Sequence, residues 1–117
     1  MVAKSFVKSR ENSTRELIIQ PQFYIQMAEI LEFGIEQFGA KVAYNFYTNV
    51  MNSILRLPAM PDIHPKNRFI ESTDKKVYRN ILAEKYSVLY SVTTRTIRVI
   101  TIYHQSINPK TIKNFVE

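Results

Sequence analysis

The hydrophobic pattern of this chain changes its period at Pro21. The preceding run at 15–20 (RELIIQ) is short and apolar, and its end at a proline is typical of a strand. After Pro21, apolar residues recur every three or four positions as far as Gly39, which predicts an amphipathic helix with Gly39 as its C-terminal cap. The stripe that we expect to face the core consists of Tyr24, Ala28, Leu31, Ile35 and Phe38.

A second amphipathic helix is predicted almost immediately after the first. Its apolar stripe ends at Pro58, which cannot continue a helix. Two such helices joined by a very short link favour an antiparallel helical hairpin. Residues 58–76 contain three prolines and many polar residues, so we expect a long connecting loop. The predicted stripe of the second helix consists of Val42, Phe46, Val50, Ile54 and Leu57.

The last third of the chain predicts a sheet. Residues 77–84, 86–92 and 96–103 are rich in β-branched and aromatic residues and are separated by short polar turns. The third run is apolar on both faces in its middle, which is typical of a central strand. Asn108-Pro109 has the character of an N-cap followed by proline at the first helical position, which predicts a short helix through Phe115.

These elements define an α+β fold in the order β-α-α-β-β-β with a short C-terminal helix. The helical hairpin must bury its apolar stripes, and the small, mainly antiparallel sheet supplies the available face. The other sheet face would then be free for partners. At 117 residues the chain is long enough for one core. We therefore expect a polar N-terminal arm at 1–14 and a single domain at 15–117.

The composition excludes several kinds of chemistry. With two glycines there is no glycine-rich phosphate loop, and with no cysteine there is no thiolate, zinc–thiolate or disulfide chemistry. The two histidines stand apart, and His64 lies alone between two prolines of the loop, so we expect no metal site and no cofactor. No secretory signal or membrane-spanning run is evident, which favours a cytoplasmic protein without a membrane partner.

Positive charge is concentrated in the second half of the sequence. Residues 1–63 carry six Lys/Arg against six Asp/Glu, whereas residues 64–117 carry ten against four, which accounts for the whole net charge of +6. Such an asymmetry favours a polyanionic or acidic partner, although solvated cations that keep a sheet edge soluble would give the same pattern. The candidate nucleic-acid contacts are Lys75, Lys76, Lys85, Arg95 and Arg98.

Several segments together are similar to one family of proteins. They are the helix link with the second helix (FGIEQFGAKVAYNFYTNVMNSILRLPAMP), the first sheet hairpin (KVYRNILAEKYSVLYSV) and the last strand with its Asn-Pro-Lys ending (RVITIYHQSINPK). Each segment alone is weak evidence, but the set in this order is specific. Over about residues 16–113 the chain resembles the RelE/ParE superfamily of type II toxin–antitoxin toxins, and most of all its branch of plasmid-stabilisation proteins.

The resemblance implies a growth-inhibiting toxin that a cognate antitoxin neutralises with a helix and a strand on its groove and sheet. RelE-like members cleave mRNA in the ribosome, and ParE-like members poison DNA gyrase. We expect ribosome-dependent mRNA cleavage first, with a DNA gyrase inhibitor that has no catalysis of its own as the alternative. A basic RNA- or protein-binding module without toxicity is a third reading.

RNA cleavage of this type needs groups that activate the 2′-hydroxyl, stabilise the phosphate and protonate the leaving oxygen. His104 is a candidate acid or base, Arg79 is a candidate phosphate clamp, and Tyr103 is a further candidate beside His104. Two of them have a structural alternative. His104 could be satisfied by a nearby backbone group. Arg79 could pair with Glu84 or Glu71 as a structural bridge.

Two positions depart from the RelE-like pattern. Nucleases of that type carry arginine directly after the first tyrosine of the Tyr-x-Val-x-Tyr strand, and Ser87 occupies that position here. A second arginine, expected just past the last strand, is replaced by the Gln105-Ser106 pair. The departures leave three options: a different catalytic set around Arg79 and His104, a gyrase-directed toxin, or a weakened toxin kept for its antitoxin complex.

Overall fold

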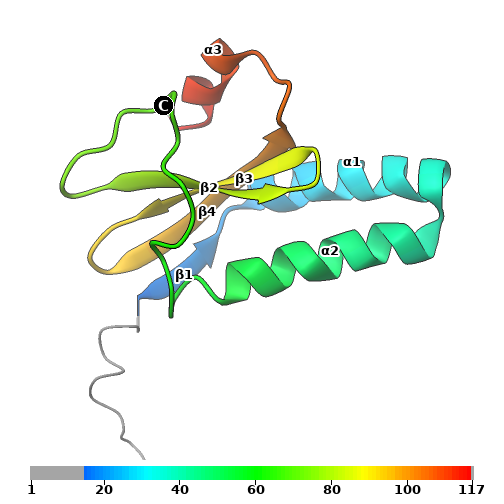
Figure 1. The fold of residues 1–117 in the computed structure, drawn as a ribbon, viewed down its shortest axis with the longest axis horizontal. Helices are drawn as coiled ribbons and strands as arrows, with labels where there is room; N and C mark the ends of the chain where they lie inside the picture. The colour runs from blue at the N-terminus through cyan, green and yellow to red at the C-terminus, as the bar shows by residue number, and fades with distance from the viewer. Residues whose placement is uncertain (1–14, 117) are drawn as a thin grey trace, which may run out of the picture.

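The computed structural model describes residues 15–116, so the arm predicted at 1–14 lies outside the described residues. The elements follow one another in the predicted order, and the α+β fold is confirmed (Figure 1). Pro21 opens the first helix, and Gly39, with a φ of 92°, separates it from the second. The elements are β1 (Glu16–Ile19), α1 (Pro21–Phe38), α2 (Ala40–Leu55), β2 (Val77–Ala83), β3 (Tyr86–Val92), β4 (Thr96–His104), α3 (Pro109–Ile112) and the 3-10 turn η2 (Lys113–Phe115).

The four strands form one sheet in the order β1-β4-β3-β2. β1 runs parallel to β4, whereas β4, β3 and β2 are antiparallel neighbours. β4 is therefore a central strand, as its apolar faces predict, and β1 and β2 form the two edges. The register shifts between Leu89 and Tyr90 of β3, which leaves Ile100 of β4 without a partner residue, as in a β-bulge.

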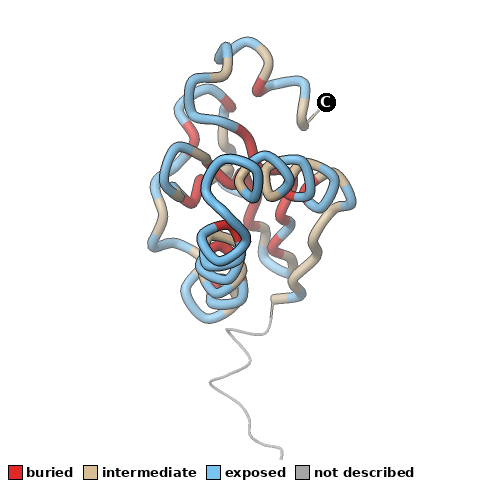
Figure 2. The backbone as a smooth tube through the Cα atoms, turned by 90° about the vertical axis from the view of Figure 1, so that its right-hand side faces the viewer, coloured by how far each residue is buried: buried red, intermediate tan, exposed pale blue. Residues whose placement is uncertain are grey.

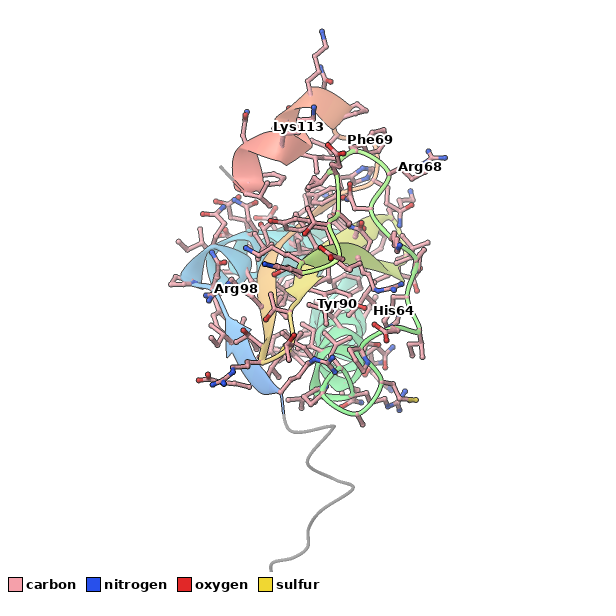
Figure 3. The ribbon with its side chains drawn as sticks, turned by 90° about the vertical axis from the view of Figure 1, so that its left-hand side faces the viewer. His64, Arg68, Phe69, Tyr90, Arg98 and Lys113 are labelled. Atoms are coloured by element: carbon pink, nitrogen blue, oxygen red, sulfur yellow. The ribbon has the colours of Figure 1, made fainter. Side chains whose placement is uncertain are left out.

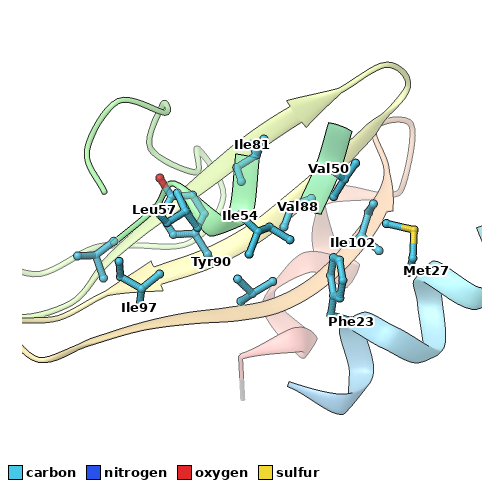
Figure 4. Close-up of a cluster of buried hydrophobic side chains, with 12 residues drawn as sticks. Phe23, Met27, Val50, Ile54, Leu57, Ile81, Val88, Tyr90, Ile97 and Ile102 are labelled. Atoms are coloured by element: carbon cyan, nitrogen blue, oxygen red, sulfur yellow. The ribbon is translucent and has the colours of Figure 1, made fainter. Parts of the chain in front are cut away.

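The helical hairpin covers one face of the sheet and buries the main core against it (Figure 1, Figure 4). Phe23 of α1 and Ile54 of α2 lie in the same buried cluster as Val88 and Tyr90 of β3. Burying a side chain of this size contributes roughly 1.5–3 kcal/mol relative to leaving it exposed. The cluster therefore fixes the hairpin on the sheet. The apolar stripe predicted for α2 is confirmed except at Val42, which is exposed.

The core stripe predicted for α1 is wrong in phase. Apart from the half-buried Leu31, its members are exposed: Tyr24, Ala28, Ile35 and Phe38. The side that packs on the sheet carries Phe23, Met27, Ile30 and Leu31. Because α1 has apolar residues on more than one side, two stripes overlap in its sequence. Docking on the sheet selects one of them and leaves the other in solvent.

The second face of the sheet is not free, contrary to the prediction. The loop before β2 and the C-terminal α3 cover it and create a second buried cluster. Phe115 of η2 stacks on Tyr103 with ring centroids 5.7 Å apart. The predicted N-cap is confirmed, because Asn108 Oδ1 accepts the backbone N–H of Lys110 at 3.0 Å. The cluster consists of Ile70, Leu89, Ile100, Tyr103 and Ile112.

The free end of the helical hairpin projects away from both cores. Figure 2 looks onto this end and shows that most of its residues are exposed, while buried residues gather between the helices and the sheet. Neither long helix within residues 15–116 combines the length and apolar character that a bilayer span requires.

Candidate functional site

An apolar groove of about 1020 Å³ runs between the helical hairpin and the β2–β3 hairpin. The helices line it with Phe38 and Val42, among other residues, and the strands line it with Ala83 and Tyr86. His104, the last residue of β4, also lines the groove. The tip of the helical hairpin and one end of the sheet therefore line the same groove.

Large apolar side chains remain exposed along this groove. The exposed fraction is 67% for Phe38, 52% for Val42 and 63% for Leu82, and all three line the groove. Phe38 is one of the residues that the sequence assigned wrongly to the core. A contiguous apolar surface of this kind usually marks a site of interaction with another protein. The excess of apolar positions on α1 is the sequence signal that could have located it.

His104 lies exposed beside the groove. Its ring packs edge-on against Tyr86, with centroids 5.3 Å apart. Nδ1 accepts the backbone N–H of Ser106 at 3.1 Å and lies 2.7 Å from the Ser106 hydroxyl. Because a backbone N–H can only donate, these contacts assign the acceptor role to Nδ1 and the proton of the neutral ring to Nε2. The structural alternative predicted for His104, a nearby backbone partner, is thus present.

Arg79 is held inside the protein by the loop that precedes β2. Its Nη1 donates to the carbonyl oxygen of His64 at 2.7 Å, and its Nε lies 3.7 Å from Asp62 Oδ1. The side chain is 16% exposed. A structural ion pair is therefore present, but with Asp62 in place of Glu84 or Glu71, because the loop folds back over β2. A guanidinium engaged in this way offers little surface to a phosphate.

The loop before β2 also holds two side chains that stay neutral, its own His64 and Tyr90 of β3. Tyr90 donates its hydroxyl proton to the carbonyl oxygen of Pro61 at 2.8 Å, and burial raises the pKa of Tyr90. Burial, followed by the positive charge of Arg79, lowers the pKa of His64. Both rings therefore stay neutral near neutral pH, and they meet edge to face with centroids 6.1 Å apart (Figure 3).

Tyr103 lies in a buried polar network on the face of the sheet opposite the helical hairpin. Its hydroxyl oxygen is 3.0 Å from Asn80 Nδ2 and 3.5 Å from Asn67 Nδ2. Asn80 Nδ2 also donates to Ser87 Oγ at 2.7 Å, and Asn67 Nδ2 donates to Asn80 Oδ1 at 2.7 Å. These four buried side chains satisfy one another, as buried polar groups must. Asn67 and Asn80 carry no sequence pattern that would have identified them.

The three candidate catalytic residues do not converge. On β3, His104 lies opposite Tyr86 and Arg79 lies opposite Tyr90. Four residues of strand, about 13 Å, therefore separate the two positions along the sheet. Tyr103 faces the other side. Groups that share one proton transfer must come within about 3 Å of the reacting atoms. The catalytic roles of the three residues stay predictions without a common site.

The five candidate nucleic-acid contacts divide into two groups. Lys75 and Lys76 precede β2, and Arg95 lies in the β3–β4 turn. Because Val77 of β2 pairs with Val92 of β3, these three residues lie at the same end of the sheet. Arg98 of β4 is exposed nearby, opposite Ser91. The fifth candidate, Lys85, lies at the other end and lines the groove. Within residues 15–116 none of the five forms an ion pair.

The two positions that depart from the RelE-like pattern have structural roles. Ser87 is buried and accepts the hydrogen bond from Asn80 described above. Gln105 Nε2 donates to the carbonyl oxygen of Tyr86 at 2.8 Å, and its backbone N–H donates to that of Lys85 at 2.8 Å. Gln105 thus fastens the β2–β3 turn to the end of β4. In the part of the chain that the structure describes, no three His, Asp or Glu side chains gather as a metal ion would require.

Comparison with known proteins identifies the fold. No family model and no curated protein sequence matches the chain. A chain of the chromosomal ParDE TA system from P. aeruginosa has a TM-score of 0.62 at 12% identity, over 79% of this chain and 97% of that chain. A chain of the archaeal RelE-RelB complex from Pyrococcus horikoshii OT3 has a TM-score of 0.53 at 15% identity, over 81% of this chain and 99% of that chain. This chain therefore shares its fold with both of these chains, as the sequence resemblance predicted.

Proposed function

We propose that this protein is the toxin of a type II toxin–antitoxin system and that its antitoxin occupies the apolar groove. The observation that carries the proposal is the exposed apolar groove, on a fold shared with a chain of a ParDE system and a chain of a RelE-RelB complex. An amphipathic helix fits such a groove, with its apolar face against Phe38 and Val42. Lys85 beside them favours an acidic residue on the partner.

The open edge of β2 offers a second contact for the same partner. The chain itself covers the first half of this edge, because Asn67 N–H donates to the Tyr78 carbonyl oxygen at 2.8 Å and Asn80 N–H donates to that of Pro65 at 2.9 Å. Backbone groups alternate along an antiparallel strand, so Leu82 is the next residue whose backbone faces this edge. Its side chain is exposed beside the groove. An extended partner segment would add to the sheet there.

For the mechanism, we favour inhibition by binding, with DNA gyrase as the target, over the mRNA cleavage expected first from the sequence. Arg79 supports this choice because it is engaged by the loop, and Ser87 supports it because it is buried where RelE-like nucleases carry arginine. Ribosome-dependent mRNA cleavage is the second candidate, since His104 is exposed at the groove. A cytoplasmic site of action follows from either target.

Induction of the chain alone in a bacterial host tests the function. Protein, DNA and RNA synthesis are followed separately by pulse labelling. We expect growth arrest with an early fall in DNA synthesis, and inhibition of supercoiling by the purified protein. If protein synthesis falls first and His104→Ala abolishes the effect, mRNA cleavage replaces gyrase inhibition in the proposal. Continued growth with all three syntheses intact would refute the toxin assignment and leave a non-toxic binding module.

Variants of the groove test where the antitoxin binds. The open reading frame beside the gene is co-expressed, and rescue of growth is scored. Val42→Asp is expected to keep toxicity but lose rescue, because it places a charge in the apolar groove. Tyr44→Asp is the matched control, since Tyr44 is exposed on the same helix but does not line the groove. Rescue of the Val42 variant as complete as that of the control would place the antitoxin elsewhere.

A further inference from the structure

The loop before β2 presents a basic and aromatic surface on the side of the sheet opposite the groove. Asn67 fixes it: its Oδ1 accepts the backbone N–H groups of Phe69 at 2.7 Å and Ile70 at 2.9 Å. Asn67 and Ile70 are both buried, and the backbone of Lys66 forms an isolated antiparallel β-bridge with that of Arg79 in β2. The residues between and beside these anchors point into solvent. Lys66, Arg68 and Phe69 are therefore exposed on a backbone that is already ordered.

The guanidinium of Arg68 lies over the ring of Phe69. The guanidinium carbon of Arg68 lies 5.6 Å from the centroid of the Phe69 ring, and Phe69 is 39% exposed. The neighbouring Ile70 enters the second core, whereas Phe69 stays outside it. Ile70 and Ile112 belong to that same core, which brings Lys113 to the end of the molecule where Phe69 lies (Figure 3).

We propose that Lys66, Arg68, Phe69 and Lys113 form a binding platform for single-stranded nucleic acid. An aromatic ring beside a guanidinium is the surface on which an unpaired base stacks, and the two lysines supply contacts to flanking phosphates. Within residues 15–116, none of the three cations pairs with a carboxylate, so their charge is available to a polyanion. The ordered loop lowers the entropic cost of binding.

A duplex or an acidic peptide fits these features less well. Bases in a duplex are already stacked on one another, and an acidic peptide would use the cations but not the exposed ring. The platform lies on the face opposite the groove, so it does not rest on the toxin proposal. A nucleic acid and a groove-bound protein could occupy the chain together.

Fluorescence anisotropy on the full chain tests the platform. The probes are labelled oligo(dT) and oligo(U), with a duplex of equal length and a poly-glutamate peptide as competitors. Phe69→Leu keeps an apolar side chain but removes the ring, and we expect it to weaken single-strand binding roughly tenfold with little effect on the duplex. Arg68→Gln should lower the slope of log K against log salt by about 1.

Arg56→Gln is the matched control, because it removes one charge from an exposed arginine at the end of α2. It should leave the affinity for single strands unchanged. Preference for oligo(dT) or for oligo(U) then distinguishes DNA from RNA as the ligand. The proposal is overturned if the duplex or poly-glutamate competes as well as single strands do. It is also overturned if Phe69→Leu binds as tightly as Arg56→Gln.

Discussion

Asn67 satisfies hydrogen-bonding groups that would otherwise be buried without partners. Its side chain accepts from two backbone N–H groups of the loop and donates to Asn80 on the sheet. A buried donor or acceptor left without a partner costs about 1–3 kcal/mol. One amide therefore ties the loop, the sheet and the Tyr103 hydroxyl into a single arrangement.

Replacing Asn67 with alanine should lower the free energy of unfolding by roughly 2–4 kcal/mol, because the two backbone N–H groups and Asn80 lose their partner together. Urea denaturation followed by circular dichroism measures the loss. Asn52→Ala is the control, since Asn52 is exposed within α2 and alanine there should be neutral or stabilise by at most about 0.7 kcal/mol. Equal stability of the two variants would contradict a structural role for the network.

His64 makes stability depend on pH. Burial and the charge of Arg79 lower its pKa in the folded chain, so the unfolded chain binds a proton at higher pH than the folded chain does. As pH falls from about 8 to about 5, protonation therefore stabilises the unfolded state and the free energy of unfolding decreases. His64→Gln should flatten this decrease. The measurement is urea denaturation at several pH values, and identical slopes in the two proteins would exclude His64 as the cause.

Residue types alone indicated chemistry at Arg79, Tyr103 and His104. The role of each side chain, however, depends on which residues the folded chain places beside it. Nothing near Arg79 in the sequence shows that Asp62 and the carbonyl group of His64 come to meet it. Only contacts between residues distant in sequence distinguish a structural ion pair from a phosphate clamp. His104, in contrast, has its backbone partner only two residues away, so the sequence alone could suggest this contact.

At the scale of elements, boundaries were predictable and orientation was not. Pro21, Gly39 and the Asn108-Pro109 pair act through local backbone chemistry, so they fix where helices begin and end. The face that α1 buries depends on the sheet, which forms from residues far along the chain. Apolar residues of α1 that do not face the sheet stay exposed, and those at the hairpin tip, such as Phe38, line the groove.

The two glycines of the hairpin predict opposite responses to alanine. Gly39 has a φ of 92°, where an L side chain is strained even though nothing lies within 4 Å of its added Cβ. Gly39→Ala should therefore lower stability by roughly 1–2 kcal/mol. Gly34 lies within α1, and an added Cβ would meet Ala43 Cβ at 3.5 Å, an ordinary contact. Gly34→Ala should raise stability by about 0.5–1 kcal/mol.

Thermal unfolding of the two variants provides the comparison, because each serves as the control of the other. The same substitution in the same hairpin should move the unfolding midpoint down at Gly39 and up at Gly34. A rise at both positions would mean that backbone strain at the link between the helices is negligible.

At the scale of the whole molecule, one sheet carries two cores. Val88 belongs to the cluster under the helices, and the next residue, Leu89, belongs to the cluster under the C-terminal segment. Because side chains alternate across a strand, neither cluster can come apart without disturbing β3 and β4. We therefore expect the described domain to unfold in one cooperative transition, as small single domains usually do.

Ile54→Ala and Ile112→Ala test this coupling from opposite sides. Both residues are fully or almost fully buried, one in each cluster, so each variant should lose about 2–5 kcal/mol. Far-UV circular dichroism follows the helices, and near-UV circular dichroism follows the tyrosines, which lie in both clusters. In each variant the two signals should move together. If Ile112→Ala instead melts the tyrosine signal early while the helices persist, the C-terminal cover is a separate unit. The sheet would then be stabilised by the helical hairpin alone, and its second face would open independently of the main core.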